Sequence, residues 1–217
     1  VEAELGGADC ITFHLREDRR HINDRDAELL KQTVATKLNM EMSADAGIVR
    51  VALRLRPDQA TLVPERRLEL TTEGGLDVVR WRRRLGPVVR KLRDKGISTS
   101  AFVEPVAEQI AAAAAVGFEA VELWTAAYAE ARTPRVRARA LEQLRVGLAG
   151  GLEQGLVVHA GHGLTYRNVG PVAALPGFGE LNIGHTIVAR AVFVGLRAAV
   201  AEMKRLIQAA AGCGHHD

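Results

Sequence analysis

The chain has 217 residues, of which 47% are hydrophobic and 25% are charged, a composition typical of a globular protein that forms one sizeable domain. Lys and Arg exceed Asp and Glu by 29 − 26 = 3, and no apolar run approaches the length of a membrane span. Only two cysteines occur, Cys10 and Cys213, which excludes a disulfide framework and favours a reducing compartment. We therefore expect a cytoplasmic protein without a membrane partner.

Short apolar segments alternate with longer helical patterns along the chain. The predicted strands are Ile11–Leu15, Leu38–Met42, Ala60–Pro64, Ser98–Val103, Ala120–Trp124, Leu156–Ala160 and Leu181–Ile183. The predicted helices are Asp24–Thr36, Ala44–Leu55, Leu76–Lys95, Val106–Val116, Thr133–Gln154, Val169–Ala174 and Ile187–Ala210. This alternation predicts a parallel sheet with outer helices, either a TIM barrel or a doubly wound sheet. No Gly-x-Gly-x-x-Gly motif follows the first strand, which argues against a doubly wound sheet of the dinucleotide-binding type.

The strand count falls one short of a complete barrel, which has eight strands. The opening segment, residues 1–7, is typical of the end of a helix that enters a strand. We therefore expect a TIM (β/α)8 barrel whose first strand is missing from this chain. A single barrel domain should span residues 1–211, followed by a tail at residues 212–217.

The densest basic stretch is Arg80-Trp81-Arg82-Arg83-Arg84. Aromatic residues make up only 4% of the chain, and no platform for stacking nucleic-acid bases is visible. We interpret the stretch as the solvated face of an outer helix and expect no nucleic-acid partner.

Polar, potentially reactive residues follow the predicted strands, as the catalytic face of a barrel requires. His14, Arg16 and His21 come from the charged segment after the first strand. Arginine suits phosphate, and histidine moves protons near neutral pH. Glu41 lies between two methionines, and burial there would raise its pKa and fit it for proton transfer.

Three further segments are candidates for the same face. Glu122 is flanked by apolar residues and must be paired or functional. His162 stands between two glycines, which leaves room for a general acid. Gly184 and His185 precede a predicted helix opening at Thr186, whose N-terminal amides could bind phosphate.

Several blocks, in this order, resemble the pyridoxine 5′-phosphate synthase family over essentially the whole chain. They are His14–Ile22, Asn39–Met42, Leu62–Arg67, Thr71–Asp77, Ala160–Leu164 and Leu181–His185. The resemblance implies that 1-deoxy-D-xylulose 5-phosphate condenses with 3-amino-2-oxopropyl phosphate through a Schiff base. The products would be pyridoxine 5′-phosphate, inorganic phosphate and water. It also implies no metal or organic cofactor, and a symmetric homo-oligomer, often an octamer.

The resemblance also assigns roles to individual residues. The catalytic residues would be His14, Glu41, Glu122 and His162, with Glu122 stabilising the transition state. The substrate-binding residues would be Arg16, His21, Thr71, Gly163, Gly184 and His185, with Thr71 on a mobile lid. The chain departs from the family pattern at Trp124, Ala126 and His159. An Asn, an Asp and an Arg that relatives carry on and after their first strand have no counterpart in this sequence.

Two other interpretations remain open. The chain could be a catalytically impaired barrel remnant that binds phosphate or assembles with partners. It could also be another sugar-phosphate barrel enzyme, such as an isomerase or an aldolase. An aldolase of the Schiff-base type needs a lysine at a strand end. We place the lysines, including Lys37, in helical stretches.

Overall fold

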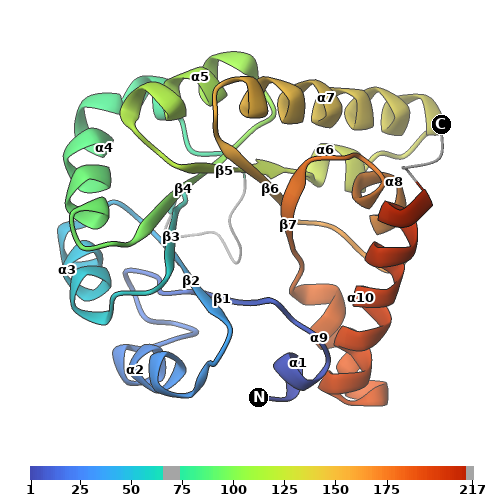
Figure 1. Cartoon of the computed structure of the whole chain (residues 1–217), viewed down its shortest axis with the longest axis horizontal. Helices are drawn as coiled ribbons and strands as arrows, with labels where there is room; N and C mark the ends of the chain where they lie inside the picture. The colour runs from blue at the N-terminus through green and yellow to red at the C-terminus, as the bar shows by residue number, and fades with distance from the viewer. Residues whose placement is uncertain (66–73, 214–217) are drawn as a thin grey trace.

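The structure is a computed structural model that describes residues 1–65 and 74–213. Within these residues, seven parallel strands form one sheet whose spatial order equals their order in the sequence. They are β1 (Cys10–His14), β2 (Lys37–Met42), β3 (Gln59–Leu62), β4 (Ser98–Val103), β5 (Ala120–Trp124), β6 (Val157–Gly161) and β7 (Phe178–Asn182). Figure 1 shows the sheet curling around a central axis, with the helices on its outside. This architecture is an α/β fold of the TIM-barrel type.

The helices join successive strands and cover the outer face of the sheet (Figure 1). They are α1 (Glu2–Leu5), α2 (Asp24–Thr33), α3 (Ala46–Leu55), α4 (Val78–Arg93), α5 (Ala107–Val116), α6 (Ala126–Ala129), α7 (Pro134–Glu153), α8 (Val169–Ala173), α9 (His185–Val194) and α10 (Leu196–Cys213). Side-chain caps define where several of them begin. Asn23 caps α2 with a capping box, and Thr133 caps α7 immediately before Pro134 at its first position.

The sequence predictions place nearly all of these elements within one to three residues. One prediction is wrong: the final helix is not continuous. It is divided into α9 and α10 at Gly195, whose φ of 81° is a conformation that interrupts helical hydrogen bonding. The single-turn helix α6 was not predicted, because four residues are too few to show a helical period. Among the described residues, no helix combines the length and apolar character needed to cross a membrane.

The inside of the curled sheet carries an unusual number of polar side chains. Asn39, Thr61, Ser100 and Glu122 are fully buried there. Buried polar groups need hydrogen-bond partners, and a chain of bonds connects several of them. Thr61 donates to Asn39 over 2.9 Å, and Asn39 donates to Thr12 over 3.3 Å. The interior of the sheet therefore contains a network of hydrogen-bonded polar side chains.

Within the described residues, β1 and β7 are the two edges of the sheet. A side-chain bridge joins them, because the Thr12 hydroxyl donates to the Asn182 Oδ1 over 3.2 Å. A cavity of about 1630 Å³ extends along both strands and reaches α10 at Met203. The predicted absence of a first strand is not confirmed by the structure, which shows only that this side of the sheet is open.

Candidate active site

His14 and Glu41 lie together at the carboxyl ends of neighbouring strands. They are register partners on β1 and β2, so the parallel pairing itself sets their side chains side by side. The His14 Nδ1 lies 3.8 Å from the Glu41 Oε2. Both side chains are largely buried, with 19% and 13% of their surface exposed. The imidazole and the carboxylate are therefore close neighbours at this end of the sheet.

Glu122 and His162 approach the same point from β5 and the end of β6. Glu122 is fully buried, and its Oε2 accepts a hydrogen bond of 2.8 Å from the Asn182 amide. His162 follows Gly161 with a φ of 69°, and its ring packs against the ring of Phe102 at a tilt of 47°, with 4.4 Å between the ring centroids. Glu41, Glu122 and His162 each offer a ligand-type atom within 4.8 Å of the others. The site therefore gathers proton-carrying groups from three separate strands.

Burial shifts the proton affinities of these groups in opposite directions. It raises the pKa of Glu41 to about 7. Burial first, and the charge of Glu41 second, raise the pKa of Glu122 well above its usual value. Burial also lowers the pKa values of His14 and His162 to about 4. Near neutral pH the imidazoles are neutral and Glu41 exchanges its proton readily, which is the condition for acid–base catalysis.

Two of the expected substrate-binding side chains lie on the loop that follows β1. Arg16 is only 3% exposed and faces Asp18, with 3.5 Å between the Arg16 Nε and the Asp18 Oδ1. His21 is exposed just before the Asn23 cap of α2. The loop thus presents one buried cation and one accessible imidazole near His14, whose pKa both of them lower.

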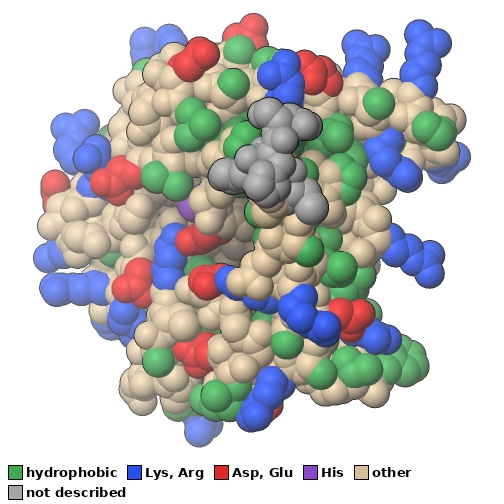
Figure 2. Space-filling model, turned by 45° about the vertical axis from the view of Figure 1, so that its right-hand side comes forward, with side chains coloured by type: hydrophobic (Ala, Val, Ile, Leu, Met, Phe, Trp, Pro, Cys, Tyr) green, Lys and Arg blue, Asp and Glu red, His purple; other side chains and the backbone are tan. Residues whose placement is uncertain are grey.

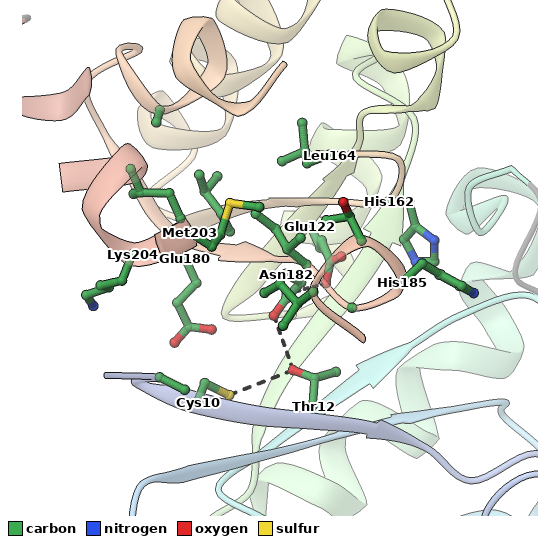
Figure 3. Close-up of a pocket in the computed structure, with 18 of the residues that line it drawn as sticks. Cys10, Thr12, Glu122, His162, Leu164, Glu180, Asn182, His185, Met203 and Lys204 are labelled. Carbon is green, nitrogen blue, oxygen red and sulfur yellow. Dashed lines mark hydrogen bonds between the residues drawn. The ribbon is translucent and has the colours of Figure 1, made fainter. Parts of the chain in front are cut away.

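The remaining expected binding residues line the cavity. Gly163, Gly184 and His185 all border it, and Figure 3 shows His185 close to His162. The helix α9 begins at His185 with Gly184 as its cap, one residue earlier than predicted, and no side chain caps it. Its first amide groups are therefore available to an anion. Thr71, predicted to contact substrate, lies outside the described residues.

Charged side chains also cover the molecular surface outside the site. Figure 2 shows Lys and Arg side chains projecting over much of the visible face, with Asp and Glu among them. Arg80 stacks 4.9 Å over the ring of Trp81 on the outer helix α4, as a solvated helix face allows. The basic stretch is accordingly separate from the cluster at the strand ends.

A family model described as "Pyridoxal phosphate biosynthesis protein PdxJ" matches residues 1–209. The chain belongs to this family. The pyridoxine 5′-phosphate synthase of Cyanothece sp. (strain PCC 7425) is 58% identical over 208 residues, which cover 96% of this chain and 87% of that protein. The corresponding synthase of Synechococcus sp. (strain CC9902) is 59% identical over 206 residues, covering 95% and 82%.

Solved structures with low sequence identity share the fold of this PdxJ-family chain. Phosphoribosyl anthranilate isomerase from Thermus thermophilus superposes with a TM-score of 0.58 at 18% identity, covering 94% of this chain and 92% of that one. The Amycolatopsis orientalis BexX/CysO complex gives a TM-score of 0.62 at 17% identity, covering 98% and 83%. At these identities the likeness shows a common barrel-type architecture and nothing about activity.

The sequence reasoning missed two side chains that the structure places in the site. Asn182 connects Glu122 to Thr12, and Figure 3 shows this chain of hydrogen bonds running from β5 through β7 to β1. Glu65, just after β3, lies against His14 and Arg16. Both residues fall inside the blocks that carry the family resemblance. Their position at strand ends was the available signal, because strand ends meet on one face of a parallel barrel.

The lysine assignment requires a correction. Lys37 is not helical: it is the first residue of β2, and its Nζ contacts the Glu180 Oε1 at 2.6 Å and the Gln59 Oε1 at 2.7 Å. Helical propensity favoured the wrong element there because Lys37 follows a helix closely. It lies at the amino end of its strand, four residues before Glu41, or about 13 Å away along an extended chain. An ion-paired lysine at that end cannot serve as a nucleophile beside the cluster of His14, Glu41, Glu122 and His162.

Proposed function

We propose that the chain is a pyridoxine 5′-phosphate synthase. It condenses 3-amino-2-oxopropyl phosphate with 1-deoxy-D-xylulose 5-phosphate and releases pyridoxine 5′-phosphate, inorganic phosphate and water. The observation that carries the proposal is the convergence of His14, Glu41, Glu122 and His162 at one end of the sheet, in a chain of this family. A condensation of this kind makes and breaks several C–H and O–H bonds, so it needs several proton carriers in one place.

In this reaction, Glu41 takes and returns protons, and His14 exchanges protons with it across their 3.8 Å separation. His162, which is neutral near pH 7, first takes up a proton within the site and then passes it to the departing oxygen. Glu122 stabilises the transition state: a developing positive charge, such as that of a protonated imine, favours the ionised form of this carboxyl group, whose raised pKa otherwise favours the protonated form. Its deep burial strengthens that interaction, because the low dielectric around it screens charge poorly.

The two phosphate-bearing substrates would be held by separate groups of residues. Arg16 and His21 hold the sugar phosphate, together with Thr71. Gly163, Gly184 and His185 hold the phosphate of the amino ketone, using the free amides at the start of α9. The family resemblance supports this division, and so does the placement of the two groups on different elements, the loop after β1 and the ends of β6 and β7.

A further parallel strand between β1 and β7 would complete an eight-stranded barrel. Both strands are edges within the described residues, and the cavity of about 1630 Å³ runs between them. Unpaired edges and an open core are costly in water, so an additional strand would stabilise the fold. Such a strand could also carry substrate-binding side chains. We therefore expect the 217-residue chain alone to bind phosphate but to form product poorly.

Two assays test this function. Calorimetric titration with inorganic phosphate should show saturable binding to the chain. Product formation should be measured on the chain and on a longer version that carries the preceding strand of a close relative. We expect turnover in the longer version and weak turnover in the short one. Absence of turnover in the longer, folded version would overturn the proposed activity, and full activity of the short chain would overturn the need for another strand.

A further inference from the structure

Glu65 is a buried carboxylate to which the proposed function assigns no role. It follows β3, and its side chain is 5% exposed. Its Oε1 accepts a hydrogen bond of 2.8 Å from the backbone amide of Glu17 and lies 3.8 Å from an Arg16 guanidinium nitrogen. Its Oε2 lies 3.6 Å from the His14 Nε2. One carboxylate therefore contacts both the histidine and the arginine that follow β1.

His14 consequently lies between two carboxylates, one at each ring nitrogen. Glu41 is at 3.8 Å from Nδ1, and Glu65 is at 3.6 Å from Nε2. The Nε2 atom and the Glu65 Oε2 atom are both buried without another hydrogen-bond partner among the described residues. Contacts of this length in a site without substrate shorten readily into hydrogen bonds. Each orphaned atom is thus the natural partner of the other.

A neutral imidazole carries its single proton on one nitrogen, and the hydrogen bond at that nitrogen decides which one. An ionised Glu65 can only accept, so it favours a proton on the His14 Nε2. The lone pair on Nδ1 then faces Glu41, whose raised pKa of about 7 leaves it partly protonated near neutral pH and able to donate a hydrogen bond to that lone pair. With the other tautomer, two proton-bearing atoms could face each other at Nδ1, and the exchange would be blocked.

We propose that Glu65 is a positioning residue that holds His14 in the Nε2–H tautomer and so sets the direction of proton exchange between His14 and Glu41. Burial raises the pKa of Glu65, and the carboxylates of Glu17 and Asp18 add to the rise, while the Glu17 amide and the Arg16 charge oppose it by favouring the ionised form that accepts from His14. In this role Glu65 acts through His14. The consequence for turnover rests on the proposed function, whereas the tautomer does not.

A second set of contacts keeps Glu65 in place. The Glu17 amide that donates to Glu65 belongs to a residue whose own carboxylate accepts a 2.7 Å hydrogen bond from the Ser43 hydroxyl, just after β2. The ends of β1, β2 and β3 are therefore tied together around His14. Glu17 offers a matched control. It lies on the loop after β1, close to Glu65, but its carboxylate contacts Ser43 instead of His14.

Nitrogen-15 NMR of the imidazole rings, assigned with His14→Gln, reports the tautomer directly in the 217-residue chain. We expect His14 to be predominantly Nε2–H near neutral pH. Glu65→Leu, which cannot accept a hydrogen bond, should shift the population toward Nδ1–H, whereas Glu17→Gln should leave it unchanged. If the leucine variant does not fold, Glu65→Gln decides, because its neutral amide holds the proton less strongly and should increase the Nδ1–H fraction.

The proposal would be overturned if the His14 ring of the wild type were predominantly Nδ1–H. It would also be overturned if the Glu65 variant that decides the test had the same tautomer ratio as the wild type. In the longer version that turns over, Glu65→Gln should lower kcat about 10-fold or more, with a smaller change in KM. Turnover that is absent from every version would contradict the proposed function alone, since the tautomer measurement requires no substrate.

Discussion

Asn182 donates a 2.8 Å hydrogen bond to the buried carboxylate of Glu122, from the last strand of the sheet to the middle of β5. The same Asn182 side chain accepts a hydrogen bond from Thr12 on β1. One amide therefore holds the buried acid of the site and also bridges the two edge strands. The hydrogen bond from Asn182 lowers the pKa of Glu122. Burial and the charge of Glu41 outweigh this hydrogen bond, so the pKa of Glu122 remains raised.

Replacing this amide by an acid should destabilise the fold. In Asn182→Asp, the donated bond is lost and a second carboxylate faces Glu122, so we expect a loss of about 2 kcal/mol in the free energy of unfolding near neutral pH. The loss should shrink as the pH falls, because protonation of either acid removes the repulsion and supplies a hydrogen-bond donor between the two groups. Urea unfolding measures it, with Asn23→Asp at the exposed cap of α2 as a control that changes stability by less than about 0.5 kcal/mol. An equal effect of the two substitutions would contradict this account.

Gly161 leaves the space that Glu122 occupies. A Cβ atom at Gly161 would lie 2.0 Å from the Glu122 Oε1 and 3.2 Å from the Asn182 Cβ. Gly161→Ala should therefore displace the carboxylate, with about 1–3 kcal/mol lost in unfolding free energy and turnover reduced at least about 10-fold. Gly150→Ala, inside α7 with no atom within 4 Å of its new Cβ, should instead stabilise the chain by about 0.5–1 kcal/mol. Thermal unfolding and a product assay compare the two.

The order and type of the elements could be predicted because each strand and most helices carry their own local pattern. The division of the last helix at Gly195 could not, because glycine inside a helical pattern is often tolerated and only the packing of α9 and α10 decides. In the site, His14 and Glu41 were predictable from strand ends, since parallel pairing aligns them. The contacts of Asn182 and Glu65 join strands distant in sequence, and these depend on how far the sheet curls.

The carboxylate of Glu41 should be needed for turnover. Glu41→Gln keeps the size and shape of the side chain but removes the base, so kcat should fall at least about 100-fold. Binding of phosphate should change far less, because Gly184 and His185 hold it from another part of the site. A product assay on the version that turns over, with phosphate calorimetry beside it, tests this. Near-normal kcat would refute the role of Glu41 as a base.

The same substitution should change how stability depends on pH. Burial raises the pKa of Glu41 from 4.5 to about 7, so the folded chain holds a proton that the unfolded chain releases. The stabilisation from this group is complete below about pH 4.5 and is lost as the pH rises to about 7. At about 1.4 kcal/mol for each pKa unit, the loss is about 3 kcal/mol.

His14 and His162 act in the opposite direction. Burial lowers their pKa values to about 4, so their contribution is present above about pH 6.5 and is lost as the pH falls toward 4. The wild-type stability curve therefore combines two opposing slopes. The difference between Glu41→Gln and wild type isolates the carboxylate. Urea unfolding at about pH 5, 6 and 7 should show that the free energy of unfolding of the Glu41→Gln variant increases, relative to that of the wild type, at each step. A difference that stays constant over this range would mean that Glu41 is not desolvated, and the basis for its role as a proton carrier at neutral pH would be lost.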